Sequence, residues 1–188
     1  EKADLFNHPL VNVFANAGIG GPNFWGEDDK WQQIIDVNLT GVYNTCMACY
    51  PWLIKSAEHG IKIRNIIITS SCLARFGVPG LTAYVSSKTA LMGLVRSLAV
   101  EWSPSGILIN AIAPGWVDTD MARQSIQEQA DMLGKSYEDM CQEVCSVLPT
   151  GRMSNPSEIA ALVNFLFSGS QQSITGTTID INNGSWMG

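Results

Sequence analysis

The chain has 188 residues, of which 46% are hydrophobic and 15% are charged, and its formal net charge is −6. This composition is typical of a compact globular protein with a sizeable core, and it excludes a disordered chain. The acidic balance argues against nucleic acid or an anionic membrane as a partner, and no apolar run is long enough to span a bilayer.

The chain contains five cysteines, an odd number that fits a reducing compartment better than a disulfide framework. Its first residues are charged and no apolar core follows them, so we see no secretory signal and expect a cytoplasmic protein. Cys46 and Cys49 are three apart, but a zinc site would need a second ligand pair, and the only histidines are His8 and His59. We therefore expect no metal and interpret the cysteines as small apolar residues.

The first predicted element is a buried strand at residues 10–15, which runs into Asn16-Ala17-Gly18 and a loop rich in glycine and proline. Residues 1–8 before it are expected to be the end of an earlier element. In an open parallel sheet, ligands bind at the carboxyl ends of the strands. Asn16 and Gly18 are therefore candidate cofactor contacts, and a turn chosen only for its backbone is the alternative.

Residues 28–56 carry apolar side chains at spacings of three and four, which predicts a helix. Asp28 and Asp29 suit its N-terminus, and Gly60 follows its end. Asn38 is a polar residue on the apolar face of this helix. Because a buried amide needs partners, we expect it to make a structural hydrogen bond.

Strands and helices alternate along the rest of the chain. Residues 64–70, 107–113 and 176–181 are apolar runs that predict strands, the first two covered on both faces. Helices are predicted at 84–103, within the more polar segment 120–150, and from an N-cap at Asn155 to residue 167. This order predicts an α/β fold with a doubly wound, Rossmann-like parallel sheet, and we expect a single domain over residues 1–188.

The stretch from residue 71 to residue 88 carries the chemistry. Tyr84 and Lys88 stand four apart at the start of a helix, so their side chains share one face. A phenol with an ordinary pKa of roughly 10 is a poor acid–base group at neutral pH, but a nearby lysine cation stabilises the phenolate. Ser71 ends a strand thirteen positions before Tyr84, and the turn-rich loop between them can fold it back toward the phenol. Alone, a Tyr-x-x-x-Lys pair is more often an ordinary helix-surface pair.

The combination of motifs resembles the short-chain dehydrogenase/reductase family. The resemblance runs from about Pro9 to the C-terminus, and the motifs occur in the family's order and spacing: Asn16-Ala17-Gly18, Asp36-Val37-Asn38-Leu39, Ser71, Tyr84-x-x-x-Lys88, Asn110-Ala111-Ile112-Ala113-Pro114-Gly115, Ile174-Thr175-Gly176 and Asp180-Ile181-Asn182.

This resemblance implies an oxidoreductase that depends on NAD or NADP and interconverts a secondary alcohol and a ketone. Tyr84 would exchange the hydroxyl proton while Ser71 holds the oxygen. Lys88 would lower the pKa of the tyrosine and bind the nicotinamide ribose. Asn38 matches the asparagine that holds a water in the proton relay behind the lysine.

The resemblance also assigns the segment after the strand at 107–113. Pro114 and Gly115 would lie beside the nicotinamide, with Val117 and Thr119 touching its carboxamide and the nearby phosphate; a rigid turn is the alternative. Residues 120–150 would be the variable flap over the substrate. Its candidate lining residues, each more often simple packing, are Trp116, Met121 and Met132.

One departure from the family pattern is that no Gly-x-x-x-Gly-x-Gly turn stands between a strand and a helix. The family places this turn in a βαβαβ unit before Asn16, and at ~30 residues per βαβ unit about 60–70 residues are lacking. We expect an N-terminal portion to precede this sequence; a separate polypeptide that completes the sheet, or a true truncation, are the alternatives. Without the first strands, the strand at 11–15 would be an apolar edge. A catalytically silent subunit that serves in assembly is the rival hypothesis.

Family members usually form dimers or tetramers, so the resemblance implies a homodimer or homotetramer, with Trp102, Trp186 and Met187 as candidate interface residues. The substrate would be a small-molecule alcohol or ketone, and the residues do not say which. A serine hydrolase is excluded because no Gly-x-Ser-x-Gly elbow surrounds Ser71.

Overall fold

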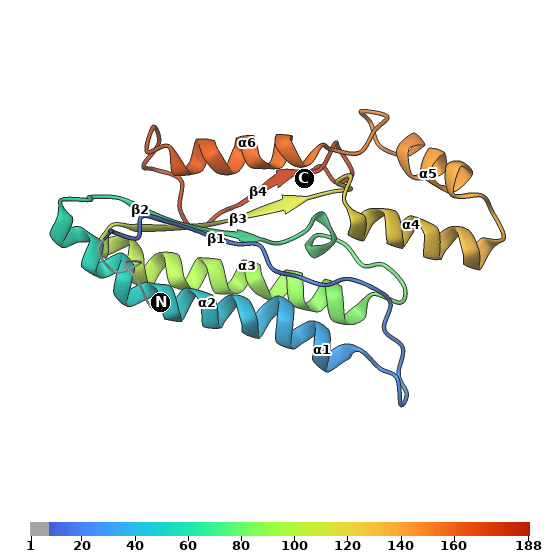
Figure 1. Cartoon of the computed structure of the whole chain (residues 1–188), viewed down its shortest axis with the longest axis horizontal. Helices are drawn as coiled ribbons and strands as arrows, with labels where there is room; N and C mark the ends of the chain where they lie inside the picture. The colour runs from blue at the N-terminus through green and yellow to red at the C-terminus, as the bar shows by residue number, and fades with distance from the viewer. Residues whose placement is uncertain (1–7) are drawn as a thin grey trace.

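The computed structural model describes residues 8–188, which form a four-stranded parallel sheet between two layers of helices (Figure 1). The strand order is β1-β2-β3-β4, and every neighbouring pair is parallel. The strands are β1 (Asn12–Ala15), β2 (Arg64–Thr69), β3 (Ile107–Pro114) and β4 (Thr178–Ile181). The predicted Rossmann-like α/β class is confirmed. Except for His8, the predicted end of an earlier element lies outside the described residues.

The helices follow the predicted order closely. The long predicted helix at 28–56 is α1 (Trp31–Ile35), a π-helical segment (Asp36–Thr40), α2 (Gly41–Lys55) and a 3-10 turn (Ser56–His59). The others are α3 (Thr82–Trp102), α4 (Asp120–Leu133), α5 (Tyr137–Ser146) and α6 (Pro156–Phe167), with short 3-10 turns at Cys72–Ala74 and Ser103–Ser105. None of the helices among residues 8–188 is both long and apolar enough to cross a membrane.

The two helical layers explain why β2 and β3 are apolar on both faces. Ile66 and Ile68 point to one face and pack with residues of α2 and α3, whereas Ile67 points to the other face and packs with α6. Figure 1 shows α2 and α3 on one side of the sheet, α6 on the other, and α4 and α5 beyond the carboxyl end of β3. This arrangement leaves the carboxyl ends of the strands next to the loops that carry the candidate site.

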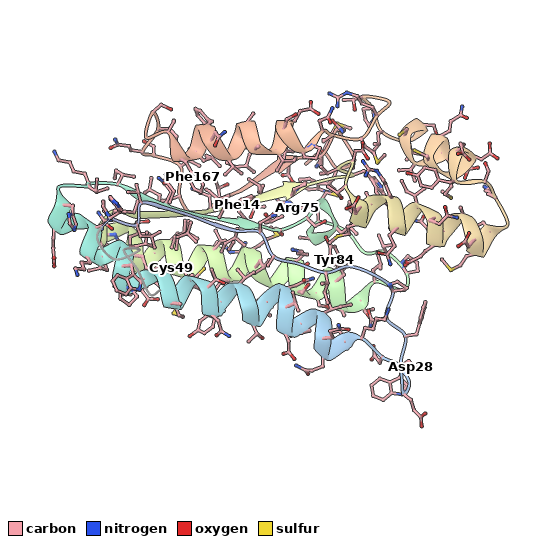
Figure 2. All side chains as sticks on the ribbon, viewed as in Figure 1. Phe14, Asp28, Cys49, Arg75, Tyr84 and Phe167 are labelled. Atoms are coloured by element: carbon pink, nitrogen blue, oxygen red, sulfur yellow. The ribbon has the colours of Figure 1, made fainter. Side chains whose placement is uncertain are left out.

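Strand β1 forms one edge of the sheet among the described residues. Val13 and Ala15 are buried toward α2, but Phe14 faces the opposite side and is 39% exposed. Figure 2 labels Phe14 on this strand, and Phe167 at the end of α6. Because α6 packs on β2 and β3, the outer face of β1 has no helix over it among the described residues.

Arg64 joins three elements at the amino end of the sheet. Its buried guanidinium donates hydrogen bonds to the carbonyl oxygens of Leu53 (3.0 Å), Ile61 (2.9 Å), Lys62 (3.0 Å) and Ser105 (2.6 Å). Burial lowers the pKa of this guanidinium. The end of α2, the start of β2 and the turn before β3 are thereby held together by one side chain.

The expectation that Trp102 lies at an interface between copies is wrong. Trp102 is 3% exposed and packs against Tyr50, with the ring centroids 4.4 Å apart. It belongs to the core between the sheet and the helices because the last turn of α3 faces β3. Trp186 is half-buried under the Arg75 guanidinium, which lies 4.8 Å from its ring, and Met187 is exposed.

Candidate active site

Ser71 and Tyr84 meet at the carboxyl end of the sheet. Ser71 directly follows β2 and Ser70, and its hydroxyl oxygen accepts a hydrogen bond from the Leu73 N–H (3.1 Å), which starts the 3-10 turn. The turn brings Ser71 to Tyr84, and the two side chains are hydrogen-bonded. Figure 2 shows Tyr84 near the start of α3, in the half of the molecule toward which β3 points. The prediction that the loop folds Ser71 back toward the Tyr84 phenol is therefore confirmed.

The pKa of Tyr84 lies above its ordinary value, opposite to the expected direction. Burial of the phenol raises this pKa, the hydrogen bond with Ser71 opposes the rise, and Cys72 adds to it. The Lys88 cation is not among the causes of this shift, so the expected lowering by Lys88 is not found. The phenol is therefore protonated at neutral pH and can donate a proton.

Lys88 is buried close to Tyr84. It is 3% exposed, its ammonium donates to the Thr69 carbonyl oxygen (2.8 Å), and its Nζ lies 5.7 Å from the centroid of the Tyr84 ring. Burial lowers the pKa of Lys88 to about 8. A lysine with such a pKa can both hold and release a proton near neutral pH.

Asn38 is fully buried and its amide is occupied by structural partners. Its Nδ2 donates to the Ile19 carbonyl (2.9 Å) and to Ser87 Oγ (3.2 Å), and its Oδ1 accepts from the Ile19 N–H (2.8 Å). The structural hydrogen bond expected from the sequence is confirmed. Asn38 also sits in the π-helical segment, a local widening often found at functional sites.

Gly18 lies against both Asn38 and Lys88. A Cβ on Gly18 would come within 3.3 Å of Asn38 Oδ1 and within 3.3 Å of Lys88 Nζ. Asn16, two residues earlier, is exposed, and its Oδ1 accepts a hydrogen bond from Thr69 Oγ1 (2.7 Å). The loop after β1 thus reaches the lysine, with only a hydrogen atom at the point of closest approach.

The segment after β3 has a structural reason for its glycine. A Cβ on Gly115 would lie 2.8 Å from the Asn182 carbonyl oxygen, so only glycine fits between the two backbones. Pro114 ends β3, Val117 pairs with Ser154, and Thr119 is the exposed N-cap of α4. The roles that the resemblance assigns to these residues beside a nicotinamide stay predictions.

The predicted flap is a pair of helices with a core of its own. Buried residues of α4 and α5 pack together, and Trp116 packs against them. Met121, at the start of α4, lies over the loop after β1, its sulfur 3.6 Å from the position of a Cβ on Gly20. Met132 is 73% exposed at the other end of α4, so it is the weakest of the three candidate lining residues.

Two hydroxyl groups that the sequence did not single out hold the helix that carries Tyr84 and Lys88. Ser70 Oγ donates to the Lys88 carbonyl oxygen (2.9 Å), and Ser87 Oγ donates to the Tyr84 carbonyl oxygen (2.7 Å). Both serines are buried. Their only sequence signal was their position beside Ser71 and Lys88.

The cysteines behave as small apolar residues. All five are free, and Cys46 is fully buried on α2, where burial raises the pKa of its thiol to about 12. Cys49, labelled in Figure 2, lies on the same helix and packs against the core. Within residues 8–188, no group of three or more His, Cys, Asp or Glu side chains is placed to hold a metal ion.

Comparison with known proteins places the chain among oxidoreductases. Residues 8–185 match the model of a family described as enoyl-(acyl carrier protein) reductase. The oxidoreductase UcpA of Salmonella typhimurium is 39% identical over 178 residues, which cover 95% of this chain and 65% of UcpA. The 3-oxoacyl-[acyl-carrier-protein] reductase FabG of Pseudomonas aeruginosa is 33% identical over 182 residues, covering 95% of this chain and 66% of FabG.

A solved structure agrees with these matches. The structure of the actinorhodin polyketide ketoreductase with NADPH superposes with a TM-score of 0.82 at 28% identity, covering 94% of this chain and 67% of that one. The chain thus spans about 65% of the length of the curated relatives that it matches.

Proposed function

The chain belongs to the short-chain dehydrogenase/reductase family, and from this premise we propose that it is an NAD- or NADP-dependent oxidoreductase that interconverts a secondary alcohol and a ketone. The observation that carries the proposal is the hydrogen-bonded pair of Ser71 and Tyr84 above a buried Lys88. Two hydroxyl groups that face one substrate oxygen are what a carbonyl reduction needs, because the oxygen gains both negative charge and a proton.

Tyr84 and Ser71 divide the work on the substrate oxygen. With its pKa raised by burial, Tyr84 would be the proton donor at neutral pH, and Ser71 would donate a second hydrogen bond to the same oxygen. Lys88, whose Nζ lies 5.7 Å from the centroid of the Tyr84 ring, would supply a proton to Tyr84 after the tyrosine has given its own. The Lys88 pKa of about 8 would let this lysine release a proton near neutral pH.

The residues around Lys88 fit a nicotinamide cofactor. When bound, such a cofactor supplies or accepts the hydride. Lys88 would hold the nicotinamide ribose. Gly18 would leave room for that ribose, because glycine puts no side chain between the loop after β1 and the Lys88 ammonium. Asn16, Pro114, Gly115, Val117 and Thr119 stay the other proposed contacts. A neighbour solved with NADPH supports this class of cofactor without choosing between NAD and NADP.

The first substrates to test are ketones of acyl chains. FabG is named for the reduction of 3-oxoacyl groups, and the superposed ketoreductase is named for polyketides. Ethyl acetoacetate and acetoacetyl-coenzyme A carry the same 3-oxoacyl group in small-molecule form. We also propose a homodimer or homotetramer, which size-exclusion chromatography with light scattering would contradict if it gave a clean monomer.

The test combines cofactor binding with one substitution. The purified protein should bind NADH or NADPH in a fluorescence titration and oxidise it in the presence of one of the two ketones. Tyr84→Phe should keep binding but lose at least ~100-fold in turnover, since general acid catalysis contributes typically that much. Near-normal turnover by a folded Tyr84→Phe protein would sink the proposal. Absence of both binding and turnover would favour the rival silent subunit, which the lack of a Gly-rich phosphate turn in this sequence suggested.

A further inference from the structure

Asn23 caps the helix that carries Tyr84 and Lys88, from a loop sixty residues away. The N–H groups of the first turn of a helix have no acceptor within the helix. Residue Leu81, at the N-cap of α3, has no side-chain acceptor to offer and makes no cap hydrogen bond. Instead, Asn23 Oδ1 accepts from the Ala83 N–H (2.8 Å) and from Thr82 Oγ1 (3.1 Å). Asn23 thus supplies the cap that α3 lacks locally.

The same residue is tied to its surroundings by two further bonds. Its backbone N–H donates to the Gly80 carbonyl oxygen (2.8 Å), which holds the turn just before α3. Its Nδ2 donates to Asp29 Oδ1 (3.2 Å), and that oxygen also accepts from the Trp31 N–H (3.0 Å) at the start of α1. Asn23 is 7% exposed. One buried side chain therefore links the starts of α1 and α3.

This link ties the loop after β1 to the first turn of α3, which carries Tyr84. The loop is held at Ile19 by Asn38 and at Asn23 by α3, and Gly18 lies between the loop and the Lys88 ammonium. Tyr84 directly follows Ala83, and the Ala83 N–H donates the hydrogen bond to Asn23 Oδ1. A shift of the first turn of α3 therefore moves Tyr84 relative to the loop after β1.

We propose that Asn23 is a positioning residue for Tyr84, acting through the first turn of α3. This inference rests on the proposed function, since it concerns the placement of the proton donor. Small misplacements of a reacting group cost far more in turnover than in binding: an error of about 1 Å can cost roughly 100-fold. Loss of the cap should thus lower kcat and leave KM for the ketone nearly unchanged.

The geometry allows an exchange of side chains that tests whether the contact between Asn23 and Asp29 is what matters. Asn23→Asp keeps the acceptor for Ala83 but brings a second carboxylate into contact with the one of Asp29. Combining Asn23→Asp with Asp29→Asn leaves a single carboxylate and removes the repulsion: the amide introduced at position 29 can donate through its Nδ2 to the carboxylate at position 23 and accept from the Trp31 N–H through its Oδ1. Asn155→Ala, which removes an asparagine from the N-terminus of α6, is the matched control.

The experiment compares these variants with Tyr84→Phe, using the test ketone that the protein reduces. Asn23→Ala and Asn23→Asp should each lose about 10- to 100-fold in kcat with KM within about 3-fold, and the double variant should return to within about 3-fold of the wild type. Asn155→Ala should keep its kcat within about 2-fold of the wild type, since α6 carries none of the reacting groups. Amide hydrogen exchange in peptides covering residues 82–88 should be faster in Asn23→Ala than in the wild type, and it should be unchanged in Asn155→Ala.

The outcomes separate this inference from the proposed function. Normal kcat in Asn23→Ala, beside an inactive Tyr84→Phe, would overturn the positioning role of Asn23 only. Equal losses of kcat in Asn23→Ala and Asn155→Ala, or no recovery in the double variant, would do the same. Full turnover by Tyr84→Phe, or a wild type that neither binds NADH or NADPH nor turns over either ketone, would overturn the proposed function and this inference with it.

Discussion

The Lys88 ammonium lies 2.8 Å from the carbonyl oxygen of Thr69, the last residue of β2. The bond joins the helix of the candidate site to the strand that leads to Ser71, and it keeps the ammonium out of water. Burial, rather than a neighbouring charge, is the cause of its lowered pKa. A buried lysine of this kind leaves a signature in the pH dependence of stability.

The first prediction concerns Lys88→Met. Between a pH of about 8 and the ordinary lysine pKa of 10.5, the folded state has lost the Lys88 proton while the unfolded state retains it, so the free energy of unfolding should rise with pH. Relative to Lys88→Met, the wild type should gain about 3 kcal/mol across this window, since one pKa unit corresponds to roughly 1.4 kcal/mol. Urea unfolding of both proteins at several values across this window measures the difference. Parallel curves for the two proteins would contradict the burial of the charge.

Gly18→Ala should disturb the site without unfolding the protein. The new Cβ meets two atoms at 3.3 Å, of which Asn38 Oδ1 is fixed by hydrogen bonds and Lys88 Nζ is the end of a flexible chain. The ammonium must therefore move by a few tenths of an ångström. We expect roughly a 10-fold loss of turnover and a cost in stability of about 1 kcal/mol. Gly77→Ala, where a Cβ meets nothing within 4 Å, should change neither quantity.

Arg64→Met should be the most destabilising of these changes. The substitution leaves buried carbonyl oxygens without their donor at the junction of α2, β2 and β3. Hydrogen bonds to a charged group contribute about 1.5–3 kcal/mol each, so a total loss of at least about 3 kcal/mol is expected. Denaturant unfolding measures the loss. Arg96→Met, at an exposed position of α3, should stay within about 0.5 kcal/mol of the wild type, and a similar small effect for Arg64→Met would refute the joining role.

Glu158 should make α6 sensitive to acid. Hydrogen bonds from Arg152 (2.7 and 2.8 Å) and from the Asn155 N–H (2.7 Å) lower the pKa of this carboxyl to about 2. Its contribution is complete above the ordinary pKa of 4.5 and is lost as the pH falls toward 2. The wild type should therefore lose more stability than Glu158→Gln does as the pH is lowered through this window. Glu101→Gln serves as the comparison, and it should behave like the wild type.

The fold class and the composition of the site could be predicted from local patterns. The apolar runs at β2 and β3, the helical spacing of α2 and α3, and the capping signal at Asn155 are each contained within a few neighbouring residues. The same holds for Tyr84 and Lys88, whose four-residue spacing places them on one face of any helix. That Ser71 would lie close to Tyr84 could also be predicted, because a strand, a short loop and a helix have few ways to connect.

Contacts between distant segments were decided only by the tertiary structure. Asn23 stands in a glycine- and proline-rich loop with no periodicity, and nothing near it in the sequence indicates that it caps a helix sixty residues later. Trp102 looked like a surface residue until the packing of α3 on the sheet buried it. The direction of the Tyr84 pKa also depends on burial, which is a property of everything packed around the phenol. The sequence alone determined which groups this protein carries and in what order; the packing of segments far apart in the chain determined their charges and positions.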